Sequence, residues 1–184
     1  MQKVKFSPEK YIRANAAILP IEKCLIADLY KNQGLTSCII IKKQLNGKFM
    51  FATFLVDRMC LGIKNTIVNC NFDNSQLEDF ISKMQASQGK FKEVSTIYFN
   101  NLLFAAIDYA AELGFNPPKD YLIAQCFLDE NLVDDGIDEI EMGWEGKPFF
   151  IQGPFDDGKR ILAKLNASVG EGNYEFVVEG SNFL

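Results

Sequence analysis

The sequence contains no histidine. A chain without imidazole cannot build a Ser-His-Asp or Cys-His catalytic arrangement, and it cannot hold zinc through histidine ligands. Any acid–base chemistry must therefore come from Asp, Glu, Lys, Tyr or Cys side chains. This absence removes the commonest hydrolase mechanisms and favours a protein that binds without catalysing a reaction.

Long apolar runs and paired cysteines are also missing. No apolar run approaches the roughly 18 residues that a membrane helix needs, and the N-terminal stretch lacks the apolar centre of a secretory signal. The five cysteines, at positions 24, 38, 60, 70 and 126, form no CxxC pair, and several lie within apolar patterns. They are typical of reduced core thiols. We therefore expect a cytoplasmic protein with no membrane partner.

A chain of 184 residues fits a single domain, 1–184. Two sub-lobes, 1–128 and 129–184, are a finer division. Charge is divided unevenly along the chain. Residues 1–72 carry 11 Lys and Arg against 4 Asp and Glu, whereas residues 73–184 carry 8 against 20. Either the two halves attract each other, or the basic half forms a face for an anionic partner such as nucleic acid.

Turn and cap signals organise the N-terminal part. Ser7 and Pro8 predict a helix that runs to about Leu19, and Pro20 predicts a second helix that ends at Asn32-Gln33-Gly34. Asn46-Gly47 then predicts a β-hairpin whose turn has two residues with positive φ. The segment "IKNTIVNCNF" supplies a third strand and completes an antiparallel meander.

The later elements alternate between helix and strand. Apolar residues wrap most of the segment 95–113, so this helix should be central and buried. The whole pattern predicts an α+β fold with N-terminal helices, a three-stranded antiparallel meander, a central buried helix and a C-terminal ββαβ unit. The further expected bounds are 74–88 and 119–128 for two helices, and 138–143, 148–152, 156–168 and 173–179 for the C-terminal unit.

The stretch "DRMCLGIKNT", residues 57–66, follows a buried strand. Met59, Leu61 and Ile63 lie at odd positions, whereas Thr66, Val68, Cys70 and Phe72 lie at even positions. One residue between Ile63 and Thr66 must therefore be absorbed by a bulge or a turn. A second interpretation makes Cys60 a reactive thiol whose pKa is lowered by Lys64 or Arg58. On that interpretation Asp57, Cys60 and Lys64 are the candidate catalytic residues.

Carboxylates offer another route to catalysis. Asp57 and Asp73 each follow a strand, and Asp108 lies on a polar stripe of the long helix with Asn101 and Glu112. Acids that converge near a sheet end could hold Mg²⁺ or Mn²⁺, as in metal-dependent hydrolases. Asp57, Asp73 and Asp108 are therefore candidate metal ligands, and a solvated helix face is the simpler interpretation of the stripe.

The glycine-rich turns do not predict a cofactor. "IQGPFDDGKRIL" resembles a strand followed by a helix start, but it lacks the spacing of a phosphate-binding loop. Asp156 and Asp157 at that helix start complement the helix dipole and would repel a phosphate. We interpret both as caps and expect no bound cofactor.

Three segments, "DRMCLGIKN", "AAIDYAAELGF" and "GKPFFIQGPFDDGKRIL", together resemble a family of uncharacterised bacterial proteins over residues 50–178. The resemblance implies a bacterial origin and one folding unit, and it carries no activity. Similar sequences have histidines where this chain has Pro118 or Lys119 and Glu175. Any chemistry of those histidines is therefore absent from this chain.

These observations favour a non-catalytic binding or protein-interaction module whose partner is a protein or a small molecule. A metal-dependent hydrolase and a nucleic-acid binder that uses the basic N-terminal part are the alternatives. Homo-oligomer formation stays open.

Overall fold

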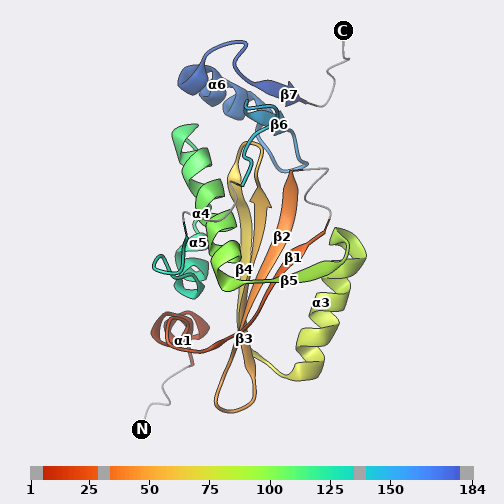
Figure 1. Ribbon diagram of the computed structural model, residues 1–184, viewed down its shortest axis with the longest axis vertical. Helices are drawn as coiled ribbons and strands as arrows, with labels where there is room; N and C mark the ends of the chain where they lie inside the picture. The colour runs from red at the N-terminus through yellow and green to blue at the C-terminus, as the bar shows by residue number, and fades with distance from the viewer. Residues whose placement is uncertain (1–5, 29–33, 135–139, 179–184) are drawn as a thin grey trace.

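The computed structural model describes residues 6–28, 34–134 and 140–178. It is a mixed α+β structure built on a five-stranded antiparallel sheet with helices on both faces, together with a two-stranded parallel sheet at one end (Figure 1). The order across the large sheet is β4-β3-β2-β1-β5. Its strands are β1 (Ile21–Ala27), β2 (Leu35–Lys43), β3 (Phe49–Asp57), β4 (Gly62–Phe72) and β5 (Phe91–Val94).

The second N-terminal helix predicted from the sequence is wrong over residues 21–27, which form strand β1, and its predicted end at Asn32-Gln33 lies outside the described residues. Helix α1 (Pro8–Asn15) is capped by Ser7 and ends four residues before the predicted Leu19. In β1 the last four residues, "CLIA", are all buried. β1 pairs with β2 on one side and with β5 on the other. A central strand covered on both faces is apolar at consecutive positions, and this pattern is easily taken for a buried helix.

The predicted hairpin between β2 and β3 is confirmed, but its turn differs. The N–H of Gly47 donates to the carbonyl of Gln44 over 3.0 Å, and Gly47 has a φ of 76°. Asn46 has no positive φ. A type I turn followed by a glycine therefore joins the strands, instead of a two-residue turn with two positive φ values.

Each face of the large sheet has its own core. Cys38, Ile40 and Phe54 face α1, α4 (Thr96–Glu112) and α5 (Tyr121–Ala124), which is followed by the 3-10 turn η1 (Gln125–Phe127). Ile39 and Phe51 face α3 (Asn74–Gln88) on the opposite side. Figure 1 shows these helices on the two sides of the sheet. Strand β3 is consequently buried on both faces, as its unbroken apolar sequence predicts.

The central buried helix is confirmed as α4. Ser95 caps it by accepting from the N–H of Tyr98. Its residues Phe99, Leu102 and Leu103 are fully buried against the sheet. With 17 residues α4 is the longest helix, and within the described ranges no helix has the length and apolar character for a bilayer crossing.

The C-terminal elements form a parallel β–α–β unit, with strands that do not join the large sheet. The unit consists of β6 (Phe149–Ile151), α6 (Gly158–Val169) and β7 (Glu175–Val177), with β6 and β7 paired in parallel. Of the additional strand predicted at 138–143, residues 140–143 lie in no strand, and 138–139 fall outside the described residues. Figure 1 shows the unit in blue beyond the turn between β3 and β4.

Candidate functional site

The turn between β3 and β4 joins the large sheet to the C-terminal unit. Asp57 as a residue is 8% exposed, and its Oδ1 accepts hydrogen bonds from the N–H groups of Met59 (2.9 Å) and Cys60 (3.1 Å). Gly62 has a φ of 65° and lies against Ala106 and Ala110 of α4. Asp57 therefore holds the turn, and Gly62 allows the turn to approach the helix closely.

The predicted bulge is confirmed at Lys64. Leu55 pairs with Asn65, whereas the next residue of β3, Val56, pairs with Ile63, so Lys64 is the extra residue. A bulge re-aims the side chain that it inserts. Here the inserted lysine reaches the C-terminal unit.

Lys64 forms a half-buried ion pair with Asp156, which lies in the turn between β6 and α6. The Nζ–Oδ2 distance is 2.6 Å, and the side chains are 18% and 13% exposed. The same Oδ2 accepts from the N–H of Gly153 over 2.8 Å. Asp156 is thus not a helix cap as predicted from the sequence; Asp157 is, through the N–H of Arg160. The charges at this junction neutralise each other.

Cys60 lies beneath the turn in an apolar cluster. Its side chain is fully buried with Leu61 and Leu113, against Phe150 and Ile161 of the C-terminal unit. Burial raises the pKa of the Cys60 thiol, whereas Lys64 opposes that shift only in part. A reactive thiol requires exposure and a lowered pKa. The structure gives Cys60 the opposite environment, that of a core residue.

Asp57 and Lys64 line one cavity of about 310 Å³, and Cys60 does not. Its walls are mostly apolar, with Leu35, Met59 and Phe149 among them. Burial raises the pKa of the Asp57 carboxyl, and the backbone hydrogen bonds and Lys64 oppose that rise. The structure therefore brings two of the three predicted catalytic residues to one cavity, where Asp57 Oδ1 accepts from the turn and Lys64 pairs with Asp156.

The three predicted metal ligands do not meet. Asp57 ends β3 opposite Gly62, whereas Asp73 follows Phe72, which pairs with Phe49 at the other end of the antiparallel pair. Asp73 caps α3 through the N–H of Gln76. Asp108 lines a different cavity, of about 620 Å³, with Glu112 and Glu141. Over residues 6–28, 34–134 and 140–178, no group of three His, Cys, Asp or Glu side chains could hold a metal ion.

A second site, which sequence reasoning missed, surrounds Lys42. This residue continues the face of β2 that Cys38 and Ile40 occupy, and the residue as a whole is 4% exposed. Its ammonium donates to the carbonyl of Ala16 at the end of α1. Burial lowers the pKa of Lys42, and the charge of Asp129 opposes this. Alternation places positions 38, 40 and 42 on one face of β2, but it could not have identified Lys42 as buried, because the opposite face is equally apolar and ends in the exposed Lys43.

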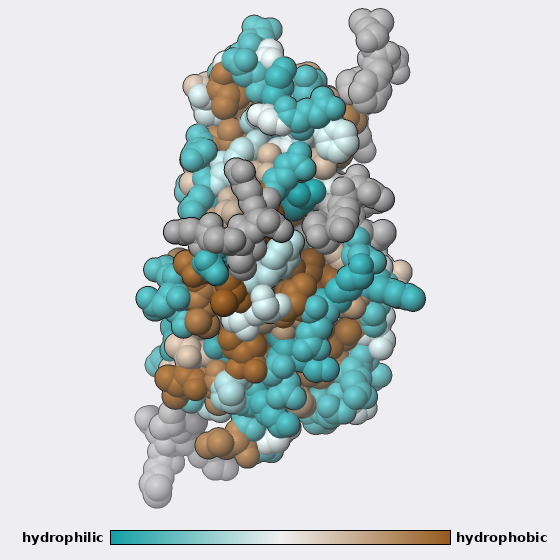
Figure 2. Space-filling view, viewed as in Figure 1, coloured by the Kyte–Doolittle hydropathy of each residue, from teal (hydrophilic) through white to brown (hydrophobic). Residues whose placement is uncertain are grey.

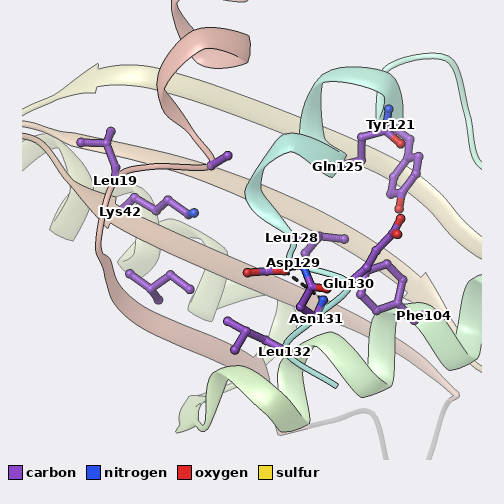
Figure 3. Close-up of a pocket in the computed structure, with 12 residues that line it drawn as sticks. Leu19, Lys42, Phe104, Tyr121, Gln125, Leu128, Asp129, Glu130, Asn131 and Leu132 are labelled. Carbon is purple, nitrogen blue, oxygen red and sulfur yellow. Dashed lines mark hydrogen bonds between the residues drawn. The ribbon is translucent and has the colours of Figure 1, made fainter. Parts of the chain in front are cut away.

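Lys42 faces a cavity of about 560 Å³ between the start of β1, α4, α5 and the loop after η1 (Figure 3). Figure 2 shows exposed apolar side chains on the face over α1 and α5, near this cavity. The loop is held from α4, because Asn100 Nδ2 donates to the carbonyls of Asp129 and Leu132, both over 3.1 Å. The cavity residues are Ala17, Leu19, Ile21, Lys42, Phe104, Tyr121, Gln125, Leu128, Asp129, Glu130, Asn131 and Leu132.

Asn101, the neighbour of Asn100 on α4, explains part of the polar stripe seen in the sequence. Its Nδ2 donates to the carbonyl of Asp134 over 2.8 Å, and its Oδ1 accepts from the N–H of Asp134 over 3.2 Å. The pair "NN" within an otherwise apolar helix thus fixes the loop that borders the cavity.

Comparisons of the chain with protein-family models, with curated proteins and with solved structures found no match. The function is therefore argued from the geometry of the two sites.

Proposed function

We propose that this chain is a non-catalytic binding module that takes a small molecule in the Lys42 cavity. The observation that carries the proposal is the buried Lys42 ammonium, which faces a cavity of about 560 Å³ with one hydrogen-bond partner, the Ala16 carbonyl, among the described residues. The proposal treats residues 1–184 as a single domain.

The argument rests on hydrogen-bond capacity. A lysine ammonium has three N–H donors, and a buried donor without a partner is unfavourable. Lys42 uses one of them on Ala16. A ligand that carries a carboxylate or another strong acceptor would satisfy the donors that face the cavity. Apolar walls with a few placed polar groups are typical of small-molecule sites.

The cations of the basic half support this choice over a nucleic-acid binder. Lys23 pairs with Glu93 over 3.9 Å, and Lys64 pairs with Asp156 over 2.6 Å. Both pairs join the basic half of the chain to the acidic half. These two lysines are therefore directed to the protein's own acids, in line with the interpretation in which the two halves attract each other.

A ligand-observed NMR screen of small polar fragments tests the proposal. The variant K42M is compared with K43M, because Lys43 is the next residue of β2 and its side chain is 51% exposed and paired with Glu22. Fragments that bind the wild type and K43M should lose binding by about tenfold or more with K42M, the loss of a charge-assisted hydrogen bond.

A second pair of variants does not alter the buried lysine. Ala17 is exposed and lines the cavity, so A17W should block fragment binding. Ala14 is exposed on α1 and is not among the lining residues, so A14W should leave binding unchanged. A screen without wild-type hits, or hits that all four variants retain, would contradict the proposed function.

A further inference from the structure

The Lys42 cavity carries opposite charges that face each other. Lys42 enters from β2, and Asp129 enters from the loop after η1; in Figure 3 their side chains point toward one another. Lys42 donates to Ala16, and Asp129 Oδ1 accepts from the N–H and Nδ2 of Asn131 over 2.9 and 3.0 Å. Within the described part of the chain, the two charged groups form no direct ion pair with each other.

The Asp129 side of the cavity is acidic. Glu130 also lines the cavity, and the Tyr121 hydroxyl points toward its carboxylate in Figure 3. Burial raises the pKa of Tyr121 to about 12, and the negative charge of Glu130 adds to the shift, so the hydroxyl stays protonated. A ligand with only a negative charge would be attracted by Lys42 but repelled by two carboxylates. A ligand that also carries a positive charge would satisfy both sides.

The remaining walls fit an apolar group. Leu19, Phe104 and Leu128 line the cavity, with Leu19 beside Lys42 and Leu128 above Asp129 in Figure 3. Only the apolar part of a ligand would gain from contact with these side chains. The three features together describe a compact zwitterion with an apolar substituent.

We infer that the cavity binds a zwitterionic amino acid with an apolar side chain, its carboxylate on Lys42 and its ammonium on Asp129. This inference rests on the proposed function and adds the ligand class. Asn100 is a positioning residue, because it holds the backbone of Asp129 and Leu132 from α4.

Three probes of similar shape separate the two charges. L-leucine carries both charges, 4-methylpentanoate lacks the ammonium, and 3-methylbutylamine lacks the carboxylate. Calorimetric titration of the full chain should show L-leucine binding about tenfold or more tighter than either analogue, since each analogue loses one charge-assisted interaction.

The variant D129N isolates the ammonium contact. Asparagine keeps an oxygen that can accept from the N–H of Asn131, so the loop should be retained. D129N should weaken L-leucine binding about tenfold and leave 4-methylpentanoate binding equal or tighter. The analogous change at Glu112, E112Q, lies outside this cavity and serves as the control.

The outcomes distinguish this inference from the proposed function. If 4-methylpentanoate binds as tightly as L-leucine and D129N changes neither, the ligand class is wrong while the binding module stands. If none of the three probes binds but the fragment screen gives hits that depend on Lys42, the amino-acid inference also falls alone. If the fragment screen is negative as well, both fall.

Discussion

Two lysines of the same sheet meet acids from later parts of the chain in different ways. Lys64 reaches Asp156 over 2.6 Å, and the carboxylate also accepts from the N–H of Gly153. Lys42 faces Asp129 across a cavity, with the Ala16 carbonyl as its hydrogen-bond partner. The first arrangement joins the lysine directly to a carboxylate, whereas the second has no ion pair between the lysine and the acid that it faces among the described residues.

The difference shows how a structural charge can be separated from a ligand-binding charge. The sequence motif around Lys64 has more chemical variety, with an acid, a thiol and two cations in ten residues. In the structure Asp57 holds a turn and Cys60 lies in an apolar core. Lys64 connects the sheet to the C-terminal unit through its ion pair with Asp156. A buried cation that faces a cavity without an ion-pair partner among the described residues is therefore a better indicator of binding than the number of reactive residue types.

The largest loss of stability should come from replacing Gly62, which allows the turn between β3 and β4 to approach α4. A Cβ at this position would lie 2.7 Å from Ala110 Cβ and 2.8 Å from the Ala106 carbonyl oxygen, at a φ of 65°. We expect G62A to lower the free energy of unfolding by about 3 kcal/mol through backbone strain and overpacking. Urea unfolding measures this.

Gly47 is the matched control for that experiment. Its φ is 76°, and no atom lies within 4 Å of an added Cβ. G47A should therefore lose only the backbone preference, about 1 kcal/mol. Equal losses at both positions would show that the junction turn is not tightly packed.

The second-largest loss of stability should come from breaking the ion pair between Lys64 and Asp156. K64M leaves Asp156 without its cation, and because both side chains are only partly buried we expect a loss of about 2 kcal/mol of unfolding free energy. Lys92 and Asp28 have the same 2.6 Å separation, but their side chains are 65% and 41% exposed. K92M should cost under about 1 kcal/mol. A larger loss in K92M than in K64M would refute the structural role of the junction pair.

The smallest expected effect is the pH dependence of stability that the Asp57 carboxyl causes. Burial raises its pKa in the folded state, so its contribution to stability is full below the unfolded value near 4 and is lost as pH rises through the folded value. D57N has no charge to bury and keeps an oxygen for the Met59 and Cys60 N–H groups. The stability of D57N relative to the wild type should therefore rise between pH 3 and pH 7, measured by thermal unfolding. A relative stability that falls over this range would mean that the carboxylate is favourably paired.

Local signals in the sequence predict much of the fold. The Ser7 cap, the hairpin at Asn46-Gly47 and the bulge between Ile63 and Thr66 each depend on neighbouring residues, and each is present, although the hairpin turn has a positive φ only at Gly47. Strand β1 could not be separated from a helix, because its apolar run is explained only by its central place between β2 and β5. Sheet order is a long-range property, and no local pattern in this chain encodes it.

The candidate sites were harder to predict for the same reason. The cavity at Lys42 combines β2, α4 and the loop after η1, which are far apart in the sequence. The alternation along β2 places Lys42 on the face of Cys38 and Ile40, but its burial could not be predicted, because both faces of this strand are apolar and the neighbouring Lys43 is exposed. The cavity and the position of Asp129 could not be predicted either, because they depend on the hydrogen bonds that Asn100 makes across 29 and 32 residues.

The most direct test of the central contrast is a crystal structure of the protein grown with L-leucine. The account predicts the amino acid in the cavity of about 560 Å³, with its carboxylate on Lys42 and its ammonium on Asp129, and an unchanged Lys64–Asp156 pair. Leucine bound beside Lys64, or a Lys42 cavity that contains only water, would contradict it.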